Sequence, residues 1–460
     1  MSNFWDFSVW GTVNLAGSLI VSMLVANMIK RSLPFMKNSL IPTSVLGGLL
    51  LLVLSIIYEA VTGDIFFDSA VFGGKGIATL EVITYHSLAL GFIASAFRPA
   101  RGQMTKQRTT EIFNTGVTTV STYLIQGIVG FAITIIASFI IEDFFQAAGI
   151  LLPFGYGQGT GQALNYGTIY ETEFGFDGGK SFGLTVAAVG FLVASIGGVI
   201  HLNVVQKKFD IRSNYTECGP AMSMHDVQGE DEIPMNGSLD KISIQMAFIM
   251  GAYLLSYAAM FILGNLIPGF KAVIYGFNFL FGVLMATIMC TVVETLRKKN
   301  IIHRQYMNTF LMTRISGFFF DVMIVAGIAA IRINRLEEFS GVLIILCTVG
   351  AVVTYFYIRL VCKVLFKEYA EEQFLGMFGM LTGTASTGII LLREVDRNLQ
   401  SPVSDNMVYQ NLPAIVFGFP IMILATLAPV KPYLVLVILT LFFILLNIIL
   451  FRSKIFGKKK

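Results

Sequence analysis

The sequence has little charge and few cysteines. Charged residues make up 13% of its 460 residues, whereas 55% are hydrophobic and the mean hydropathy is +0.74. Soluble domains use about 25% charged residues, so this composition excludes an ordinary soluble protein. The four cysteines include no CxxC pair, and we expect neither a disulfide nor a metal site built on them. A net charge of only +4 gives no reason to expect a nucleic-acid partner.

The opening residues, MSNFWDFSVW, lack the basic n-region and the small-residue cleavage site of a signal peptide. We therefore expect the first apolar run to remain as a span. Apolar runs of about 20 residues, the length that an α-helix needs to cross a bilayer core, alternate with short polar loops. The sequence thus predicts an all-α integral membrane protein, with the lipid bilayer as its surroundings. Eleven spans are predicted, at 8–28, 41–61, 80–97, 113–141, 181–203, 243–264, 272–294, 309–331, 340–362, 405–428 and 430–451.

Basic loops alternate with acidic ones along the chain. The basic residues are Lys30, Arg31, Lys37, Arg98, Arg101, Lys106, Arg108, Arg297, Lys298, Lys299, Arg304 and Lys458 to Lys460. The intervening loops carry Asp64, Asp68, Glu142, Asp143, Glu171 and Glu173. Because basic loops stay in the cytoplasm, this pattern predicts a multi-pass protein of the cell (inner) membrane, with its amino terminus outside and its carboxyl terminus in the cytoplasm.

Two further apolar segments, 147–166 and 373–392, are interrupted by small and polar residues. Counting either segment as a full crossing would invert every later loop and place the basic loops outside. We therefore expect both to be re-entrant hairpins, the first entering from outside and the second from the cytoplasm. Non-helical backbone at membrane depth is tolerated only where protein or a water-filled space surrounds it.

The two halves of the chain repeat one order of elements. Each has four spans, an interrupted segment and a fifth span, and GYGQGTGQAL at 155–164 aligns with GMLTGTASTG at 379–388. Five spans is an odd number, so the second half must be inverted in the membrane, which is typical of secondary transporters. The predicted divisions are a first repeat at 1–203, a cytoplasmic linker at 204–242, a second repeat at 243–428, and an extra span with a basic tail at 429–460.

The interrupted segments carry the candidate binding groups. Alternating glycines disfavour a helix, so we expect unwound backbone whose carbonyl oxygens bind a hard monovalent cation. The amides that open the following helix would attract a carboxylate. The alternative is that the glycines serve only close helix packing. The candidate residues are Gly157, Gln158, Gly159, Thr160, Gly161, Gln162 and Asn165 in the first segment and Thr382, Gly383, Thr384, Ser386 and Thr387 in the second.

Asp321 is the acidic residue placed deepest within a predicted span. A charge at a span centre costs roughly 2.5–3.5 kcal/mol on insertion scales, so it needs a partner or a function. One interpretation is a pair with Arg314 or a protonated, hydrogen-bonded acid. The other is a ligand for a cation or a proton. His86, in the mirrored span, is expected to be a satisfied core residue rather than a proton relay.

Three stretches resemble the bacterial glutamate:sodium symporter family: LPFGYGQGTGQA at 152–163, IPTSVLGGLL at 41–50 and FGFDGGKSFGLTVAAVGFLVASIGG at 174–198. The resemblance extends to about residue 428. It implies sodium-coupled uptake of glutamate, a homodimer, and an elevator-like movement of the hairpin-bearing part, with no cofactor besides the coupling sodium ion. Carried onto this chain, the motif places sodium at Gly159, Thr160 and Gly161, to which the mirrored Thr384 is added.

The sequence departs from the family at three places. Gln158 stands where the motif has histidine, the second hairpin carries threonine and serine in place of a more apolar pattern, and Asp321 lies where the family is usually uncharged. Gln158 and Asp321 favour the alternative of another organic anion or amino acid, driven by sodium or protons. A channel is disfavoured because its filter loops are usually identical around one axis. An enzyme is disfavoured because no Ser/His/Asp, HExxH or paired-aspartate group lies within the spans.

The predicted topology can be tested by cysteine labelling. A cysteine introduced at Lys75 or at Gly178 is expected to react with a membrane-impermeant maleimide added to intact cells, because both loops are predicted to lie outside. Reaction only after permeabilisation would overturn the inverted-repeat argument.

Overall fold

The structure is a computed structural model, which describes residues 3–33, 36, 39–97, 105–209, 232–233, 239–396 and 401–455. Helices contain 84% of these residues, and none of them lies in a strand, although Glu232 and Gln305 form an isolated bridge. Lys37, Arg98, Arg101, Cys218, Lys458 to Lys460 and most of the predicted linker lie outside the described residues. The predicted all-helical class is confirmed.

Ten of the described helices are long and apolar enough to cross a membrane. They are α1 (Phe7–Ser32), α3 (Thr43–Thr62), α4 (Gly76–Ala96), α5 (Lys106–Ala137), α7 (Gly179–Phe209), α9 (Lys241–Leu266), α11 (Asn278–Lys298), α12 (Thr309–Ala329), α13 (Ser340–Leu365) and α18 (Pro432–Leu450). Each overlaps a predicted span. The predicted span 405–428 is a pair of helices, α16 (Val403–Tyr409) and α17 (Asn411–Leu427), bent by 50°, and counting the pair as one broken span gives eleven in the described residues. A multi-pass membrane protein is thus supported.

The remaining helices are shorter or interrupted. They are α6 (Leu151–Phe174), α10 (Lys271–Gly276), α14 (Ala370–Thr382), α15 (Ala385–Arg393) and α19 (Arg452–Ile455). Short 3₁₀ turns lie at η1 (Phe66–Asp68), η2 (Ala70–Phe72), η3 (Gln146–Ile150), η4 (Pro268–Phe270), η5 (Ile333–Arg335), η6 (Glu337–Phe339) and η7 (Lys367–Tyr369).

The chain forms two compact units. Unit 1 comprises Met1–Glu81, Gln103–Tyr215 and Ile324–Lys460, and unit 2 comprises Val82–Gly102 and Thr216–Met323. Helices α4 and α12 therefore each run from one unit into the other. The predicted division into two sequence repeats stays a prediction, because compactness does not test whether two stretches are related by a repeat.

Unit 2 is held by an apolar core from α4, α9, α11, the first turn of α12 and the loop before it. This core consists of Ile93, Ala94, Phe97, Ile249, Ala252, Ala286, Met307 and Met312. A Cβ at Gly282 of α11 would lie 2.6 Å from Cγ1 of Ile93, so the glycine lets these two helices approach closely. Glu232, in the described part of the linker, accepts hydrogen bonds from Lys241 (2.7 Å) and Asn308 (2.6 Å).

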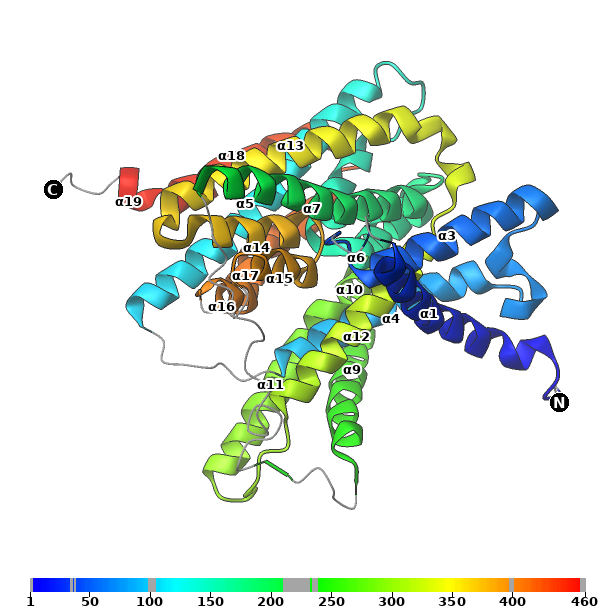
Figure 1. Cartoon of the computed structure of the whole chain (residues 1–460), viewed down its shortest axis with the longest axis horizontal. Coiled ribbons are helices and arrows are strands. Elements are labelled where there is room, and N and C mark those ends of the chain that lie inside the picture. The colour runs from blue at the N-terminus through cyan, green and yellow to red at the C-terminus, as the bar shows by residue number, and fades with distance from the viewer. Residues whose placement is uncertain are drawn as a thin grey trace. The chain divides into compact units, whose positions relative to one another are not determined.

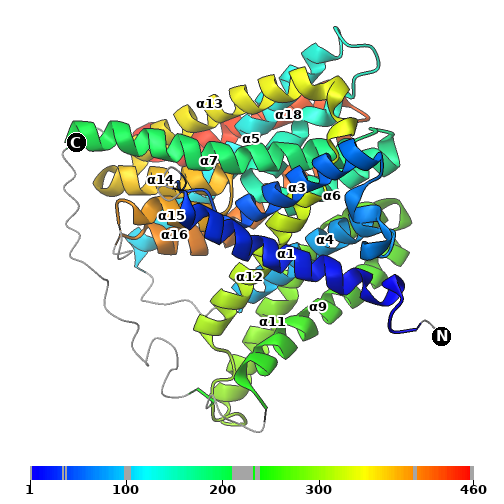
Figure 2. The ribbon, with the colours of Figure 1, turned by 45° about the vertical axis from the view of Figure 1, so that its right-hand side comes forward.

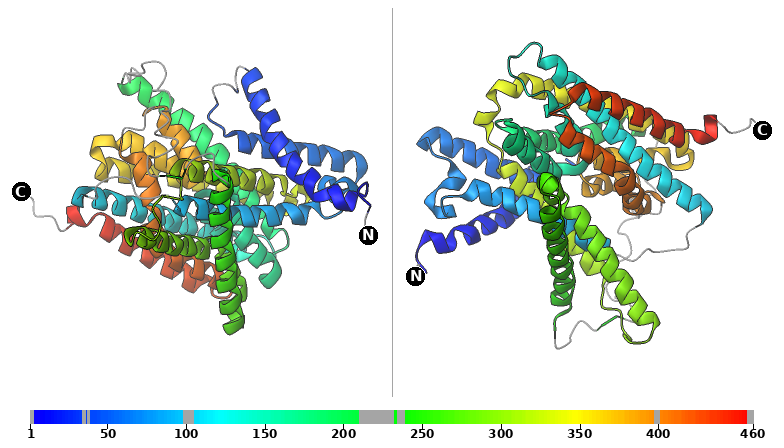
Figure 3. Two further views of the ribbon diagram at one scale, coloured as in Figure 1. Left: turned by 90° about the horizontal axis from the view of Figure 1, so that it is seen from below. Right: turned by 180° about the vertical axis from the view of Figure 1, so that it is seen from behind.

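Unit 1 is organised around α5, which is more buried than any other candidate span. Helices α13 and α18 run alongside it, as the yellow, red and cyan ribbons show (Figures 1 and 3). Its other neighbours include η3, α6 and α17. Helix α7 contacts α6, α13, α14 and α15, and the last two lie beside it in Figure 2.

The segment 146–174, η3 with α6, folds back on itself at Gly159; we name it the first folded segment. The rings of Phe154 and Tyr166 stack with centroids 3.9 Å apart, although residues 12 positions apart on a straight helix would be about 18 Å apart. Phe145, just before the segment, likewise stacks on Phe176, just after it, at 4.7 Å. Both ends of the segment therefore lie together, with Gly159 at its tip.

Helices α14 and α15 form the second folded segment, 370–393. A Cβ at Gly379 would lie 2.7 Å from Cα of Gly388, and a Cβ at Gly388 would lie 2.3 Å from the carbonyl oxygen of Gly376. The two arms are thus in backbone contact, which any side chain at these glycines would prevent. The chain turns between the arms at Gly383 and Thr384.

The two folded segments approach α5 from opposite ends. Thr134, near the end of α5, donates a hydrogen bond to the carbonyl oxygen of Gln146 at the base of the first segment (2.6 Å). Thr115, near the start of α5, accepts one from Gln373 at the base of the second segment (3.2 Å). The tips of both segments therefore lie near the middle of α5.

The close contact between the arms of the second segment predicts a stability effect. Gly388→Ala should lower the free energy of unfolding by about 1–3 kcal/mol, because its methyl group would overlap the Gly376 carbonyl. Gly17→Ala is the control, since a Cβ there meets nothing within 4 Å and removing a helical glycine gains up to about 1 kcal/mol. Thermal unfolding of the two purified variants in detergent measures both effects, and equal stability would contradict the described packing.

Candidate functional site

The first candidate site is the helix break at Gly159. Its φ of 77° and ψ of −170° interrupt α6 in a region of backbone space that is essentially restricted to glycine. The residues on either side remain helical, so the unwound stretch is shorter than the sequence predicted. The packing explains why. Gly155 lies against Val186 and Ala187 of α7, and Gly157 lies against the ring of Tyr123, so these glycines provide close contact within a helix.

The second break lies at Gly383 and Thr384. Thr384 is extended and caps α15, since its hydroxyl accepts a hydrogen bond from the backbone N–H of Thr387. Its hydroxyl also lies 3.3 Å from that of Thr387. Thr384 and Thr387 therefore hold the start of an α-helix, whose free amides carry partial positive charge, whereas Thr382 donates to the carbonyl oxygen of Phe378 (2.6 Å).

Both breaks meet near Gly190 of α7. A Cβ at Gly190 would lie 2.5 Å from the carbonyl oxygen of Thr382, in the second segment, and 2.9 Å from the ring of Tyr156, in the first. A Cβ at Gly383 would lie 3.3 Å from the ring of Phe191. The two tips, which are far apart in the sequence, thus share one position along α7.

Helix α5 supplies hydrogen bonds to both breaks. Tyr123 donates its hydroxyl to the carbonyl oxygen of Gly157 (3.1 Å). Gln126, one turn further along α5, donates to the carbonyl oxygen of Leu381 (2.9 Å) and to the hydroxyl of Thr354 on α13 (3.0 Å). Both carbonyls lie in the last turn of helix before a break. The carbonyls of a last turn have no N–H of a following turn to accept from, so they need another donor.

Sequence analysis did not identify Tyr123, Gln126, Thr354 or Gly190. The available signal was the run TTVSTYLIQG at 118–127, which is unusually polar for a membrane span. Its partners on α6, α13 and α14 depend on tertiary packing, so the run alone could not have shown which groups it serves.

The predicted site residues in the two segments are mostly buried. Gly157, Gly159, Thr160, Gly161, Gln162, Asn165, Thr382, Gly383 and Thr387 are buried, Gln158 and Thr384 are half-buried, and Ser386 is exposed. Thr160 packs against Gly327, where a Cβ would lie 2.6 Å from Cβ of the threonine. The carbonyl of Gly157, one of the predicted cation ligands, is already bonded to Tyr123.

Gln162 differs from the other buried polar residues of the first segment. It is 1% exposed, and neither its side-chain oxygen nor its side-chain nitrogen has a hydrogen-bond partner among the described residues. A buried, unpaired polar group costs about 1–3 kcal/mol, so it indicates a strained or functional position. Gln162 lies in the first turn after the Gly159 break, where a bound solute could meet it.

Asp321 belongs to unit 2, where it is half-buried on α12. The two breaks belong to unit 1, so Asp321 and the breaks lie in different units. Arg314, on the same helix, lies over the ring of Phe310 at 5.2 Å. His86 is hydrogen-bonded to the hydroxyl of Tyr253 (2.6 Å), but the residue is exposed, so the expectation of a core histidine is wrong.

The base of the second segment is fixed by an ion cluster. Glu371 accepts hydrogen bonds from both terminal nitrogens of Arg359 on α13, and it is 3.0 Å from Nε2 of His201 on α7. The Nδ1 of His201 is bonded to the hydroxyl of Tyr355 (2.8 Å). Burial alone would raise the pKa of Glu371, but the bonds from His201 and Arg359 outweigh it and lower the pKa to about 2.

Comparison with protein-family models and with curated proteins found no match to this chain. The assignment of a function therefore rests on the sequence and on the geometry of the two breaks.

The Glu371 cluster predicts a pH dependence of stability. A carboxyl whose pKa is lowered by folding stabilises the protein above its unfolded pKa, near 4.5, and this contribution is lost as the pH falls towards about 2. Glu371→Gln should therefore lower the melting temperature at pH 7, and the difference from wild type should shrink below about pH 4.5. Glu372→Gln, at the neighbouring position, is the control and should show no such convergence. A constant difference for Glu371→Gln from pH 7 to pH 3 would contradict the assignment.

Proposed function

We propose that the protein is a sodium-coupled secondary transporter, a symporter, for glutamate or a closely related small carboxylated solute. The observation that carries the proposal is the convergence of two helix breaks, at Gly159 and at Gly383 to Thr384, on the middle of α5 and α7. Paired helix breaks at corresponding positions of two halves are typical of transporters, in which they form the substrate and ion site.

The opposed approach of the two segments supports their interpretation as re-entrant hairpins of an inverted repeat. Their bases lie near Thr134 and Thr115, towards opposite ends of α5, as predicted for one hairpin from each side of the membrane. In this proposal the amino terminus is outside, the carboxyl terminus is cytoplasmic, and the protein is a homodimer of the inner membrane that works by an elevator-like movement.

The chemistry of the breaks fits a sodium ion together with an anionic solute. The carbonyl oxygens near Gly159 and Gly161 and the hydroxyls of Thr160 and Thr384 are the neutral, hard oxygen ligands that a monovalent cation prefers. The amides that open the second arms offer partial positive charge to a carboxylate. Gln162, whose carboxamide has no described partner, would serve the solute as a donor and an acceptor.

A second candidate is a transporter of the same fold for a different organic anion or amino acid, driven by sodium or by protons. Two features favour it: Gln158 in place of the family's histidine, and the half-buried Asp321 on α12, which could bind a second cation or a proton. A substrate panel at several pH values separates the two candidates, because proton coupling makes uptake follow a pH gradient in the absence of sodium.

Uptake by proteoliposomes tests the leading candidate. An inward sodium gradient should drive glutamate accumulation, and Thr160→Val should lower the initial rate at least tenfold, because a buried oxygen ligand is lost while the shape is kept. Thr168→Val is the matched control on the same arm, where the hydroxyl only bonds the carbonyl oxygen of Leu164 (2.8 Å), and it should retain activity. Glutamate uptake that ignores the sodium gradient, or that Thr160→Val leaves unchanged, would exclude this function.

A further inference from the structure

A polar stripe runs along α5 from its first turn to its middle. Its members are spaced three or four positions apart, so they share one face of the helix: Arg108, Glu111, Thr115, Thr119, Thr122 and Gln126. The last four are at most 1% exposed. The stripe begins at the end of α5 nearest the base of the second segment and ends at Gln126, which bonds Leu381 next to the second break.

The carboxamides of α14 and α16 lie near this stripe. Gln373 donates to Thr115 (3.2 Å), and Asn406 lies 3.5 Å from both Gln373 and the hydroxyl of Tyr369. Gln410, at the end of α16, lies 3.5 Å from the sulfur of Met380, which is three residues before the second break. Helices α5, α14 and α16 are in mutual contact. Thr115, Gln373, Asn406 and Gln410 thus form a row of polar groups that continues from the base of the segment towards its break.

Three oxygens, two in this row and one at the end of the α5 stripe, have no hydrogen-bond donor within the described part of the chain. They are Oδ1 of Asn406, Oε1 of Gln410 and Oε1 of Gln126, in side chains that are at most 2% exposed. The threonine hydroxyls of the stripe donate to carbonyls of their own helix, as Thr119 does to Thr115 (3.1 Å), and so retain acceptor capacity. Buried acceptors without donors are costly, and ordered water or a cation can satisfy them.

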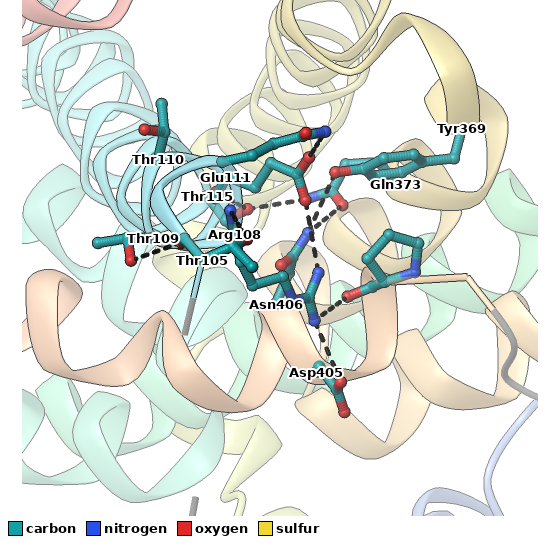
Figure 4. Close-up of polar contacts among 12 residues, drawn as sticks. Thr105, Arg108, Thr109, Thr110, Glu111, Thr115, Tyr369, Gln373, Asp405 and Asn406 are labelled. Carbon is teal, nitrogen blue, oxygen red and sulfur yellow. Dashed lines mark hydrogen bonds and ion pairs between the residues drawn. The ribbon is translucent and has the colours of Figure 1, made fainter. Parts of the chain in front are cut away.

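An acidic cluster marks the outer end of the row (Figure 4). Arg108 pairs with Glu111 (3.4 Å) and with Asp405 (3.1 Å), so one guanidinium and two carboxylates leave a net charge of −1. Asp405 is 59% exposed, whereas Glu111 is 19% exposed and also bonds the hydroxyl of Tyr369. The cluster therefore faces solution on one side and the carboxamide row on the other, which suits a site where a cation exchanges with water.

We propose that this row, formed by Thr115, Gln373, Asn406 and Gln410, is the path by which the coupling cation passes between the second break and the solution beside Glu111 and Asp405. The inference rests on the proposed function and adds a route to it. The charge pattern of the loops places this end in the cytoplasm, so the path serves cation release. Neutral oxygens suit a path, because they replace the cation's hydration without holding it as tightly as carboxylates would.

Sodium flux in proteoliposomes tests the path. Asn406→Leu and Gln410→Met keep the side-chain shape but remove the unpaired oxygen. Each should lower radioactive sodium flux and sodium-driven glutamate uptake at least tenfold, while equilibrium sodium binding in detergent stays within about twofold of wild type. The melting temperature should change little, because each variant removes an unsatisfied buried acceptor together with amide contacts that are long, at 3.5 Å. This last readout shows that each variant is folded.

Asn447→Leu on α18 is the matched control. Its side-chain nitrogen donates to the carbonyl oxygen of Phe443 (2.8 Å) and its oxygen accepts from the hydroxyl of Tyr357 (3.0 Å), so its loss should lower stability but leave sodium flux unchanged. Wild-type flux in both Asn406→Leu and Gln410→Met would overturn the path and leave the proposed function standing. Absence of sodium-dependent uptake in the wild type would overturn the proposed function and the path together.

Discussion

A helix that breaks inside an apolar surrounding must find partners for the backbone groups that the break exposes, and in unit 1 these partners come from α5. Tyr123 serves the carbonyl of Gly157 and Gln126 serves that of Leu381. Each unpaired group would cost several kcal/mol in hydrocarbon, so these bonds from α5 stabilise both breaks. The burial of α5, its polar face and its position between the two folded segments follow from this one requirement.

The glycines of the two folded segments have two different roles, close packing and breaking the helix. Gly155, Gly379 and Gly388 allow elements to touch at backbone distance, and Gly157 makes room for the ring of Tyr123; all four stay in helical positions. Gly159 alone adopts a positive φ within α6. Close packing and a helix break are therefore not alternatives for GYGQGTGQAL. Packing holds the arms rigidly against α5 and α7, and this rigidity confines the break to one residue.

The sequence predicted correctly those features that depend on a single stretch of residues. Apolar length located the described spans. Interruption of hydrophobicity located the second folded segment within three residues of 370–393, whereas the first, predicted at 147–166, extends to 174. It overestimated the unwinding around Gly159, because helix propensity neglects the packing of Gly155 and Gly157. It missed Tyr123, Gln126 and the carboxamides of α16, since a polar residue in a span shows no partner until the fold brings one. The inverted repeat and the bound species stay predictions.

The distribution of charge gives a physical reason for the coupling that we propose. Ionised groups lie at the bases of the folded segments, where Lys180 pairs with Glu81 (3.0 Å) and Arg359 with Glu371. The tips, by contrast, carry hydroxyls, carboxamides and backbone. A cation bound there alone, or a carboxylate bound there alone, would leave a net charge in a medium of low dielectric constant, at a cost of several kcal/mol. Binding both together cancels most of that charge. A site built from neutral groups would therefore move the two solutes together, and the coupling would follow from solvation rather than from a dedicated ionised residue.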